Sequence, residues 1–422
     1  MKNLYPILLL LACLSGSVQA QNPLNEYYTK AQKAYETGDF RSYSLFMLKC
    51  DSIRPLHPVI LQNLAGSYAL SKQEEKAFET LYRLIRFKAS PSLWEDADLA
   101  SLKKSSAYAA LQTEWQAEQA PILRSDTLFT MADSTAHLES VVFDTLTQRF
   151  FMGSVHHRMI YQRNAQGEIS PFTQAHDSIM AILGIAIDYK RSLLWASSSA
   201  TPEMRNYDKT LEGKSYILGF DLATGALRYR LEGPTESFHF FGDVLVDAQG
   251  TIWVSDSGSP ILYRISNPEK GIETVSSTPA LSIQGLALHP NGKYLYFSDY
   301  TSGVYIYHLG TQEIKRLPYN PQLYSMKGID GLYFYDNQLI ATHNGTDPMR
   351  VVAYQLNEEG TELIGRKVLE NNHPAFFEPT LGMIHHDQLY FVANSAWRSY
   401  DKNGQPIPAL LRRPLVFKMP LK

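Results

Sequence analysis

The spacing of apolar residues changes near residue 122. Between residues 22 and 122, apolar positions recur three and four apart among alanine, leucine, glutamate and lysine, which predicts amphipathic helices. After Pro121 the chain consists of short alternating runs rich in valine, isoleucine, tyrosine and phenylalanine, separated by Asp/Asn-Gly turns. This second pattern predicts β-strands. We therefore expect a helical domain at 22–122 and a β-sheet domain after it.

The β-sheet part repeats one motif six times. Each copy begins with an apolar run, passes through a turn and returns through an aromatic strand, as in "GDVLVDAQGTIWVSDS" and "QGLALHPNGKYLYFSDY". The copies begin at Glu139, Leu183, Gly242, Gln284, Asp330 and Leu381. Successive copies start 42 to 59 residues apart, the length of a four-stranded blade with variable loops. We predict a mainly β fold, a six-bladed β-propeller at 126–420, because sixfold recurrence disfavours a β-sandwich or two separate sheets.

The sixth copy is one strand short of a complete blade. It is followed by a single further strand, "PLVFKMP". We expect "DTLFTM" at residues 126–131 to supply the missing strand. Such an exchange closes the ring of blades and removes open sheet edges.

The helical part resembles a short helical-repeat array. Its two helix pairs, "EYYTKAQKAYETGDFRSYSLFML" and "PVILQNLAGSYALSKQEEKAFETLYRLIRF", resemble tetratricopeptide repeats. That resemblance implies a groove that docks a peptide or a partner protein. The plainer interpretation, which we favour, is a helical cap that covers one face of the propeller.

The N-terminal sequence has the pattern of a secretory signal peptide. A lysine near the start, an apolar run from Leu4 to Leu14 and small residues at Val18 and Ala20 predict a signal over residues 1–20 and a periplasmic or secreted protein. The alternative is lipid attachment through Cys13. Cleavage after Ala20 leaves Cys50 as the single cysteine, so no intramolecular disulfide is expected. No later apolar run reaches the roughly 20 residues of a transmembrane helix.

Charge and motif content exclude several function classes. The formal net charge is −3 and the chain has no runs of lysine or arginine, so nucleic acid is not an expected partner. The sequence contains no G-x-S-x-G, H-E-x-x-H or Walker motif and no cysteine pair. Serine-hydrolase, zincin and nucleotide chemistry therefore lose support, and a small-molecule ligand or substrate remains.

A propeller brings the first residue of each inner strand and the last residue of the next strand to one face, where sites usually form. Carboxylates and amides at such positions are suited to calcium, which takes six to eight oxygen ligands. The metal ligands predicted are Glu139, Gln284 and Asp330. The further mouth residues predicted are Asp243, Asn344, Glu378 and Asn394. The alternative is that Asp243 and Asp330 accept turn amides, a structural role that we favour for Asp256 and Asp299.

Two families resemble this propeller sequence. "LESVVFD" and "GIDGLYFYDNQL" resemble the "EGPVWD" and "ADGIAVD" segments of the senescence-marker-protein, gluconolactonase and luciferin-regenerating-enzyme family. That resemblance implies a divalent metal, usually calcium or zinc, held at Glu139, Gln284 and Asp330, with Asp330 also the catalytic base. The chain departs from the family pattern where Gln284 and Gly242 replace asparagines. "GIAIDYKRSLLWASSS" and "YILGFDLATGALRYRLEGP" are similar to the yellow and major royal jelly proteins, which are mainly ligand binders.

Two functions are consistent with these residues. The first is metal-dependent hydrolysis of a small lactone or ester, in which a divalent metal, calcium above others, polarises the carbonyl and Asp330 or a neighbouring histidine activates water. The second is a non-enzymatic binding protein whose channel mouth holds a small molecule or whose helical repeats hold a peptide or protein. His157, His239 and His343 lie nearest that face in sequence, and each is better explained by loop packing.

Overall fold

The computed structural model describes residues 23–174, 176 and 178–422. The predicted signal peptide and Cys13 lie outside these residues. Within them, Cys50 is buried and unpaired. No helix in this part of the chain combines the length and the apolar character that crossing a membrane requires.

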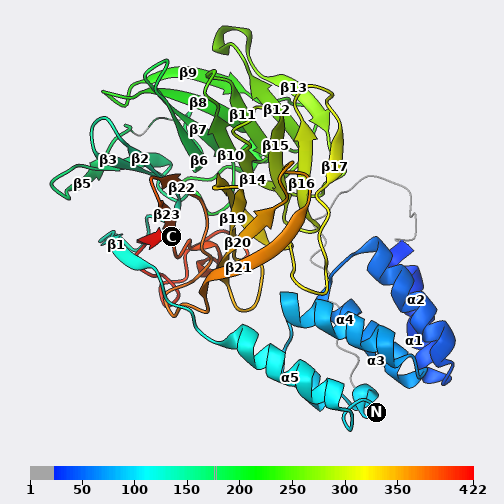
Figure 1. The fold of residues 1–422 in the computed structure, drawn as a ribbon. Coiled ribbons are helices and arrows are strands. Elements are labelled where there is room, and N and C mark those ends of the chain that lie inside the picture. Colours follow the sequence, from blue (N-terminus) through cyan, green and yellow to red (C-terminus); the bar gives the residue numbers. More distant parts are fainter. Residues whose placement is uncertain (1–22, 175, 177) are drawn as a thin grey trace.

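Helices make up the N-terminal part of the described chain (Figure 1). The α-helices are α1 (Pro23–Glu36), α2 (Phe40–Ile53), α3 (Pro58–Leu70), α4 (Glu74–Phe87) and α5 (Ser106–Gln119). The turn before α2 uses Gly38, whose φ is +75°, and Asp39, whose side chain accepts a hydrogen bond from Ser42 N at 3.0 Å. One apolar core, which includes Met47, Leu61 and Leu81, joins the helices.

The rest of the described chain forms six antiparallel four-stranded sheets arranged as blades. The first blade contains β2 (Leu138–Asp144), β3 (Arg149–Ser154), β4 (Met159–Arg163) and β5 (Ile169–Pro171). The second contains β6 (Ala181–Asp188), β7 (Leu193–Ser199), β8 (Ser215–Asp221) and β9 (Leu227–Glu232). The third contains β10 (Phe241–Val246), β11 (Ile252–Asp256), β12 (Ile261–Ile265) and β13 (Glu273–Ser277). The next two contain β14 (Ile283–Leu288), β15 (Tyr294–Asp299), β16 (Gly303–His308), β17 (Ile314–Arg316); and β18 (Ile329–Tyr335), β19 (Gln338–His343), β20 (Arg350–Leu356), β21 (Leu363–Asn371). The sixth contains β22 (Gly382–His385), β23 (Gln388–Val392), β24 (Leu415–Pro420) and β1 (Asp126–Thr130). The predicted six-bladed propeller, with helices before it, is confirmed.

The ring closes through an exchanged strand, as predicted. β1 pairs with β24 on the outer edge of the sixth blade, with Thr127 opposite Phe417 and Phe129 opposite Val416. The first and last strands of the propeller therefore lie side by side (Figure 1). Residues separated by almost 300 positions share one blade, so the ring cannot open without breaking this pairing.

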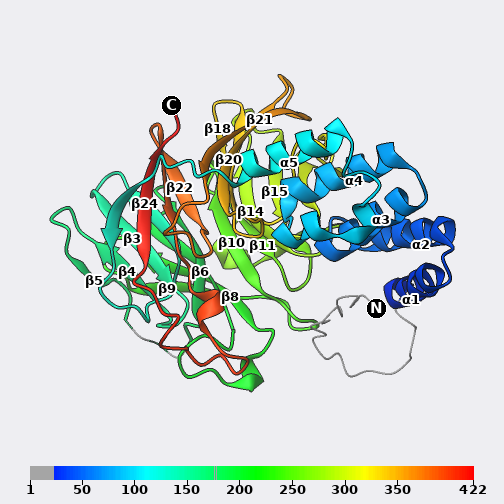
Figure 2. The same ribbon diagram turned by 90° about the horizontal axis from the view of Figure 1, so that it is seen from below.

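The helices contact the fifth blade (Figure 2). Asp347 N donates to Phe87 O at 3.0 Å, next to the bridge between Lys88 and Asp347. The chain that leaves α5 pairs with the end of β21, where Ile122 and Asn371 exchange two backbone hydrogen bonds of 2.9 and 3.0 Å. The helical part is thus held by backbone pairing at two points.

Candidate functional site

The six inner strands, β2, β6, β10, β14, β18 and β22, line the central channel. In the first five of these blades, the pairing between the inner strand and the next strand loses register at the opening residues, as at Phe241/Val244 and Ile329/Leu332. A bulge of this kind turns a side chain out of the regular alternation and is frequent beside functional sites. The opening side chains are therefore positioned by a repeated backbone irregularity.

Hydroxyl groups of the second strands satisfy the backbone at these bulges. Gly184 N donates to Ser197 Oγ at 2.9 Å, Asp243 N to Ser255 Oγ at 2.9 Å, and Gly331 N to Thr342 Oγ1 at 2.8 Å. In the fourth blade, Ser298 Oγ donates to Gly285 O at 3.4 Å. The serine or threonine that recurs in β7, β11, β15 and β19 is therefore a sequence signal for the bulge.

These openers meet around a cavity of about 300 Å³ at one end of the channel. Its lining is Glu139, Leu183, Phe240, Gly242, Asp243, Gln284, Tyr300, Asp330, Asn344, Glu378, Leu381 and Trp397. The structure therefore brings together all three predicted metal ligands and three of the four further mouth residues. Tyr300 follows β15, and Trp397 begins a short 3₁₀-helix (Trp397–Ser399) after β23; neither residue was predicted.

Glu139 is held by three donors. Its carboxylate accepts hydrogen bonds from Ser395 Oγ at 2.5 Å, Trp397 Nε1 at 2.9 Å and Thr380 Oγ1 at 3.1 Å, and its residue is only 6% exposed. Ser395 in turn contacts His137 Nε2 at 3.1 Å. Burial, followed by the nearby Asp330 carboxylate, raises the pKa of Glu139 well above its usual value. Its orientation is fixed by the surrounding side chains.

Asp330 stands at the end of a hydrogen-bonded chain. The Tyr300 hydroxyl donates to Asn344 Oδ1 at 2.9 Å, and Asn344 Nδ2 donates to Asp330 Oδ2. Burial raises the pKa of Asp330 to about 6, against the opposing effect of the Asn344 hydrogen bond. Asn344 thus fixes one carboxylate oxygen of Asp330, and the Thr380 side chain also contributes a hydrogen bond to this carboxylate.

Gln284 and Gly242 are complementary in size. Gln284 Nε2 donates to Ser282 Oγ at 3.1 Å. Its Oε1 lies 3.5 Å from the position that a Cβ atom on Gly242 would take. The longer amide of Gln284 therefore extends over the backbone of a residue that has no side chain. The two departures from the family pattern are linked in space.

Asp243 ties two inner strands together. Its Oδ1 accepts from Val244 N at 2.8 Å and its Oδ2 from Leu286 N of β14 at 3.1 Å. Burial raises its pKa to about 7, since the two amides offset only part of the desolvation. The predicted structural alternative, acceptance of backbone amides, is thus present in Asp243, while its side chain also borders the cavity.

Glu378 lines the cavity from the segment that precedes β22 of the sixth blade. Its carboxylate accepts from Arg398 N at 3.0 Å and pairs with Arg398 Nε at 3.0 Å. Burial raises its pKa above the usual value. Arg398 follows Trp397 in the loop after β23, so this loop supplies both the indole that contacts Glu139 and the partner of Glu378.

Asn394 is used elsewhere in the fold. Its Nδ2 donates to Arg413 O at 3.0 Å and its Oδ1 accepts from Leu415 N at 2.6 Å, so it positions the chain that enters β24.

Asp256 and Asp299 accept loop amides, including those of Phe240 and Ser282, as the structural interpretation predicted. The three histidines make hydrogen bonds with other polar groups of the fold. His157 contacts the Tyr161 hydroxyl and His239 contacts the Asp256 carboxylate. His343 contacts Lys327 O and the Tyr354 hydroxyl.

The lining has the composition of a cation site. It contains four carboxyl groups, on Glu139, Asp243, Asp330 and Glu378, and no lysine, arginine or histidine among the described residues. Oxygen donors of this type fit a hard divalent cation such as calcium. In the described part of the chain, no group of three or more histidine, cysteine, aspartate or glutamate side chains is placed to hold a metal ion.

Comparison with known proteins gives matches at the level of fold. No protein-family model and no curated protein matches the chain. Among solved structures it is similar to a luciferin-regenerating enzyme (13% identity, 71% of this chain and 95% of that chain, TM-score 0.49). It is also similar to a gluconolactonase from Xanthomonas campestris (13%, 72% and 97%, 0.47) and to a calcium-binding protein, regucalcin, from Agrobacterium tumefaciens (15%, 71% and 95%, 0.49).

Proposed function

We propose that this protein is an exported, divalent-metal-dependent hydrolase of small lactones or esters, with its active site in the cavity at the strand-opening end of the channel. The observation that supports the proposal is the charge of the lining: four carboxyl groups face one cavity of about 300 Å³, and only Glu378 among them pairs with a basic side chain, that of Arg398, in the described chain. Burial, followed by repulsion from Asp330, raises the pKa of Glu139, and a bound cation would offset both effects. A cavity of this size accommodates a small ring but not a macromolecule.

The residues that line the cavity and their hydrogen-bond partners would have different roles in this reaction. Glu139, Gln284 and Asp330 would hold the cation, which when bound supplies polarisation of a carbonyl oxygen. Ser395, Trp397 and Thr380 keep the Glu139 carboxylate in one orientation. The ionised Asp330 accepts the proton of the attacking water, and Asn344 fixes its position through the contact with Tyr300. Leu183, Phe240 and Leu381 supply the apolar part of the lining that excludes other water.

The test combines metal analysis with a screen of lactones and esters. The purified protein is expected to contain one divalent cation per chain and to hydrolyse at least one lactone. Asp330→Asn removes the proton acceptor and is expected to lower kcat at least about 100-fold, the usual contribution of a general base. Asp401→Asn is the matched control, because Asp401 lies in an exposed turn where its carboxylate accepts from Asn403 N and Gln405 N. A protein without metal and without turnover would rule the proposal out.

A second candidate is a non-enzymatic binding protein. The observation that favours it is Glu139, whose two carboxylate oxygens already accept three hydrogen bonds from the chain. A carboxylate satisfied in this way is suited to a structural role as much as to metal binding. In that case a small polar molecule would bind between Gln284 and Asp330 without being converted. Calorimetry with unreactive lactone analogues distinguishes the two, since binding without metal or turnover supports the second candidate.

A further inference from the structure

A second cavity, of about 470 Å³, occupies the other part of the channel. Whereas the first cavity is lined by the opening residues of the inner strands, this one is lined by the residues that follow them in the same strands. Asp243 and Leu381 border both cavities, so they mark the boundary between the two. The outer end of the second cavity lies at the turns after the inner strands, where Tyr189 is 44% exposed.

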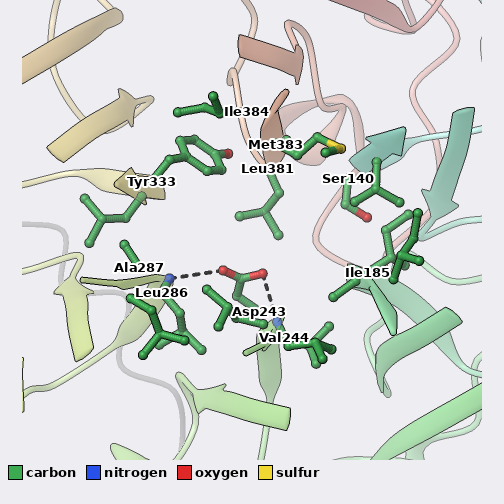
Figure 3. A pocket seen from close by; sticks show the side chains of 18 of the residues that line it. Ser140, Ile185, Asp243, Val244, Leu286, Ala287, Tyr333, Leu381, Met383 and Ile384 are labelled. Carbon is green, nitrogen blue, oxygen red and sulfur yellow. Dashed lines mark hydrogen bonds between the residues drawn. The ribbon is translucent and has the colours of Figure 1, made fainter. Parts of the chain in front are cut away.

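Aliphatic side chains surround this second cavity, and polar groups such as the Asp243 carboxylate and the Ser140 hydroxyl lie among them (Figure 3). Each inner strand contributes an aliphatic or thioether side chain, and these are Val142, Ile185, Val244, Leu286, Leu332 and Met383. A soluble ligand that fills such a space gains from the removal of apolar surface from water. A cavity of about 150 Å³ lined by leucine, isoleucine and phenylalanine holds benzene, so about three times that volume accommodates a chain of eight carbons.

The polar groups in this wall are few, and most already have partners within the fold. Ser140 Oγ donates to Leu183 O. The Tyr189 hydroxyl accepts from Thr145 N at 3.0 Å, and Asp247 accepts from Thr251 N at 2.8 Å. These groups therefore have little capacity left to recognise a ligand.

One polar group at the inner end differs from these. The Asp243 carboxylate accepts one backbone amide at each oxygen, which leaves further acceptor capacity on both. The Tyr333 hydroxyl is fully buried beside Gly331 and is not accessible to a ligand. No lysine, arginine or histidine of the described chain lines the cavity, so an anionic head group would find no countercharge.

We propose that this second cavity binds a linear aliphatic molecule whose single head group donates a hydrogen bond to Asp243. An alkyl alcohol and an alkyl ammonium ion share this chemistry. The aliphatic chain extends along the wall towards Tyr189, and the head group lies at the boundary with the first cavity. This site adjoins the proposed hydrolytic site at Asp243 and does not depend on its activity.

Calorimetry with 1-octanol, octylamine and octanoate tests the proposal directly. Octanol and octylamine are expected to bind with one molecule per chain, and octanoate at least tenfold more weakly. Along the series from butylamine to octylamine, affinity is expected to rise about fourfold per methylene, because each buried methylene contributes about 0.8 kcal/mol. Equal binding of octanoate, or affinity independent of chain length, would overturn the proposal.

Variants at the mouth locate the bound molecule. Ala248 is exposed and lines the cavity, so Ala248→Trp is expected to obstruct the entrance and to weaken octylamine binding at least tenfold without affecting folding. Gln249→Trp is the matched control, because Gln249 is the exposed neighbour and its side chain is outside the lining. Unchanged binding in Ala248→Trp, or equal weakening in both variants, would place the ligand elsewhere and refute the site.

Discussion

Inside the channel, the carboxyl groups of Glu139, Asp243 and Asp330 are buried beside one another, and desolvation is the first cause of the raised pKa of each. Such a group is protonated in the folded chain at a pH where it is ionised in the unfolded chain. The folded state therefore binds more protons, and the free energy of unfolding falls as the pH rises between the two pKa values. Burial at these residues costs stability at neutral pH.

Asp243 isolates this effect, because its pKa moves from 3.8 to about 7. Asn at this position resembles the protonated acid. Relative to wild type, Asp243→Asn is therefore expected to gain about 1.4 kcal/mol in free energy of unfolding per pH unit between about 4 and 7. Urea titrations at pH 4, 5, 6 and 7 measure this difference. Asp330 and Tyr333 face the same region and remain unchanged in the variant.

The exposed Asp401 provides a control of opposite sign. The amides of Gln405 and Asn403 hold its pKa below the usual value, so its contribution to stability is present above the pKa of the unfolded chain and is lost in acid. Asp401→Asn should accordingly show no gain between pH 4 and 7. A parallel gain in both variants would mean that net charge, not burial of Asp243, causes the pH dependence.

Residue positions within strands were predictable, whereas loop contributions were predicted only in part: Glu378 was predicted, and Tyr300 and Trp397 were not. Glu139, Gln284 and Asp330 follow from repeat alignment, since equivalent positions in a propeller meet at one face. Trp397 and Tyr300 reach the cavity from loops whose course depends on tertiary contacts. Asn344 and Asn394 occupy equivalent positions after second strands. The Asn394 amide makes hydrogen bonds with the loop before β24, so only Asn344 lines the cavity.

At the scale of elements, the inner strands approach one another closely where they carry glycine. A Cβ atom on Gly285 of β14 would lie 2.5 Å from both Asp330 O and Leu332 N of β18. On Gly242, by contrast, the nearest atom would be Gln284 Oε1 at 3.5 Å, an ordinary contact distance. Neither glycine has a φ in the left-handed region. Space between blades, not backbone conformation, distinguishes the two positions.

This contrast gives a matched pair of substitutions. Gly285→Ala is expected to lower the free energy of unfolding by about 2–3 kcal/mol, because two backbones would have to separate. Gly242→Ala is expected to stay within about 1 kcal/mol of wild type, since the added methyl fits and alanine reduces the freedom of the unfolded chain. Denaturant midpoints of the two variants measure this difference. Equal destabilisation would show that the close approach at Gly285 is readily relieved.

Strands and blades were predicted from the sequence more completely than individual site residues were. Period-two alternation and aromatic second strands identified the blades, and arithmetic on the sixth copy identified β1 as the exchanged strand. The bulges could not be predicted from apolar alternation, because they interrupt it at Gly184, Gly285 and Gly331. The hydroxyls that satisfy them, including those of Ser197 and Thr342, became meaningful only with the strand pairing known.

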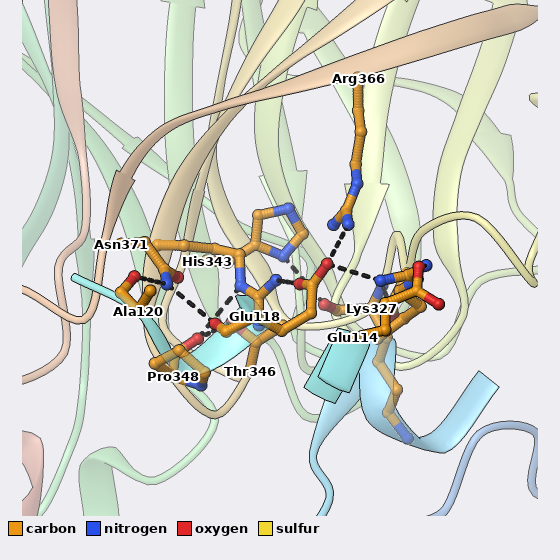
Figure 4. A network of polar contacts seen from close by, with 12 residues as sticks. Glu114, Glu118, Ala120, Lys327, His343, Thr346, Pro348, Arg366 and Asn371 are labelled. Atoms are coloured by element: carbon orange, nitrogen blue, oxygen red, sulfur yellow. Dashed lines mark hydrogen bonds and ion pairs between the residues drawn. The ribbon is translucent and has the colours of Figure 1, made fainter. Parts of the chain in front are cut away.

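At the scale of the whole molecule, one buried carboxylate holds the helices on the propeller (Figure 4). Glu118 at the end of α5 accepts from Arg350 of β20 at 2.6 Å, from Arg366 of β21, and from Arg86 of α4 at 2.7 Å. Burial opposes ionisation of Glu118, but Arg366 and Arg350 outweigh it and lower its pKa below the usual value. The contribution of Glu118 to stability is thus present at neutral pH and is lost as the pH falls through that lowered pKa.

Glu118→Gln leaves three guanidinium groups, including that of Arg350 at 2% side-chain exposure, without their shared carboxylate. The free energy of unfolding is expected to fall by about 3–5 kcal/mol, the usual result of removing one partner from a buried ion pair. Hydrogen exchange is expected to accelerate in α5 and in β20 and β21 before it does in β10. Glu114→Gln is the matched control: Glu114 also pairs with Arg86, but its side chain is 38% exposed, so a loss below about 1 kcal/mol is expected. If the two variants are equally stable, backbone pairing at Asp347 and Asn371 is what holds the helices, and the carboxylate adds nothing to it.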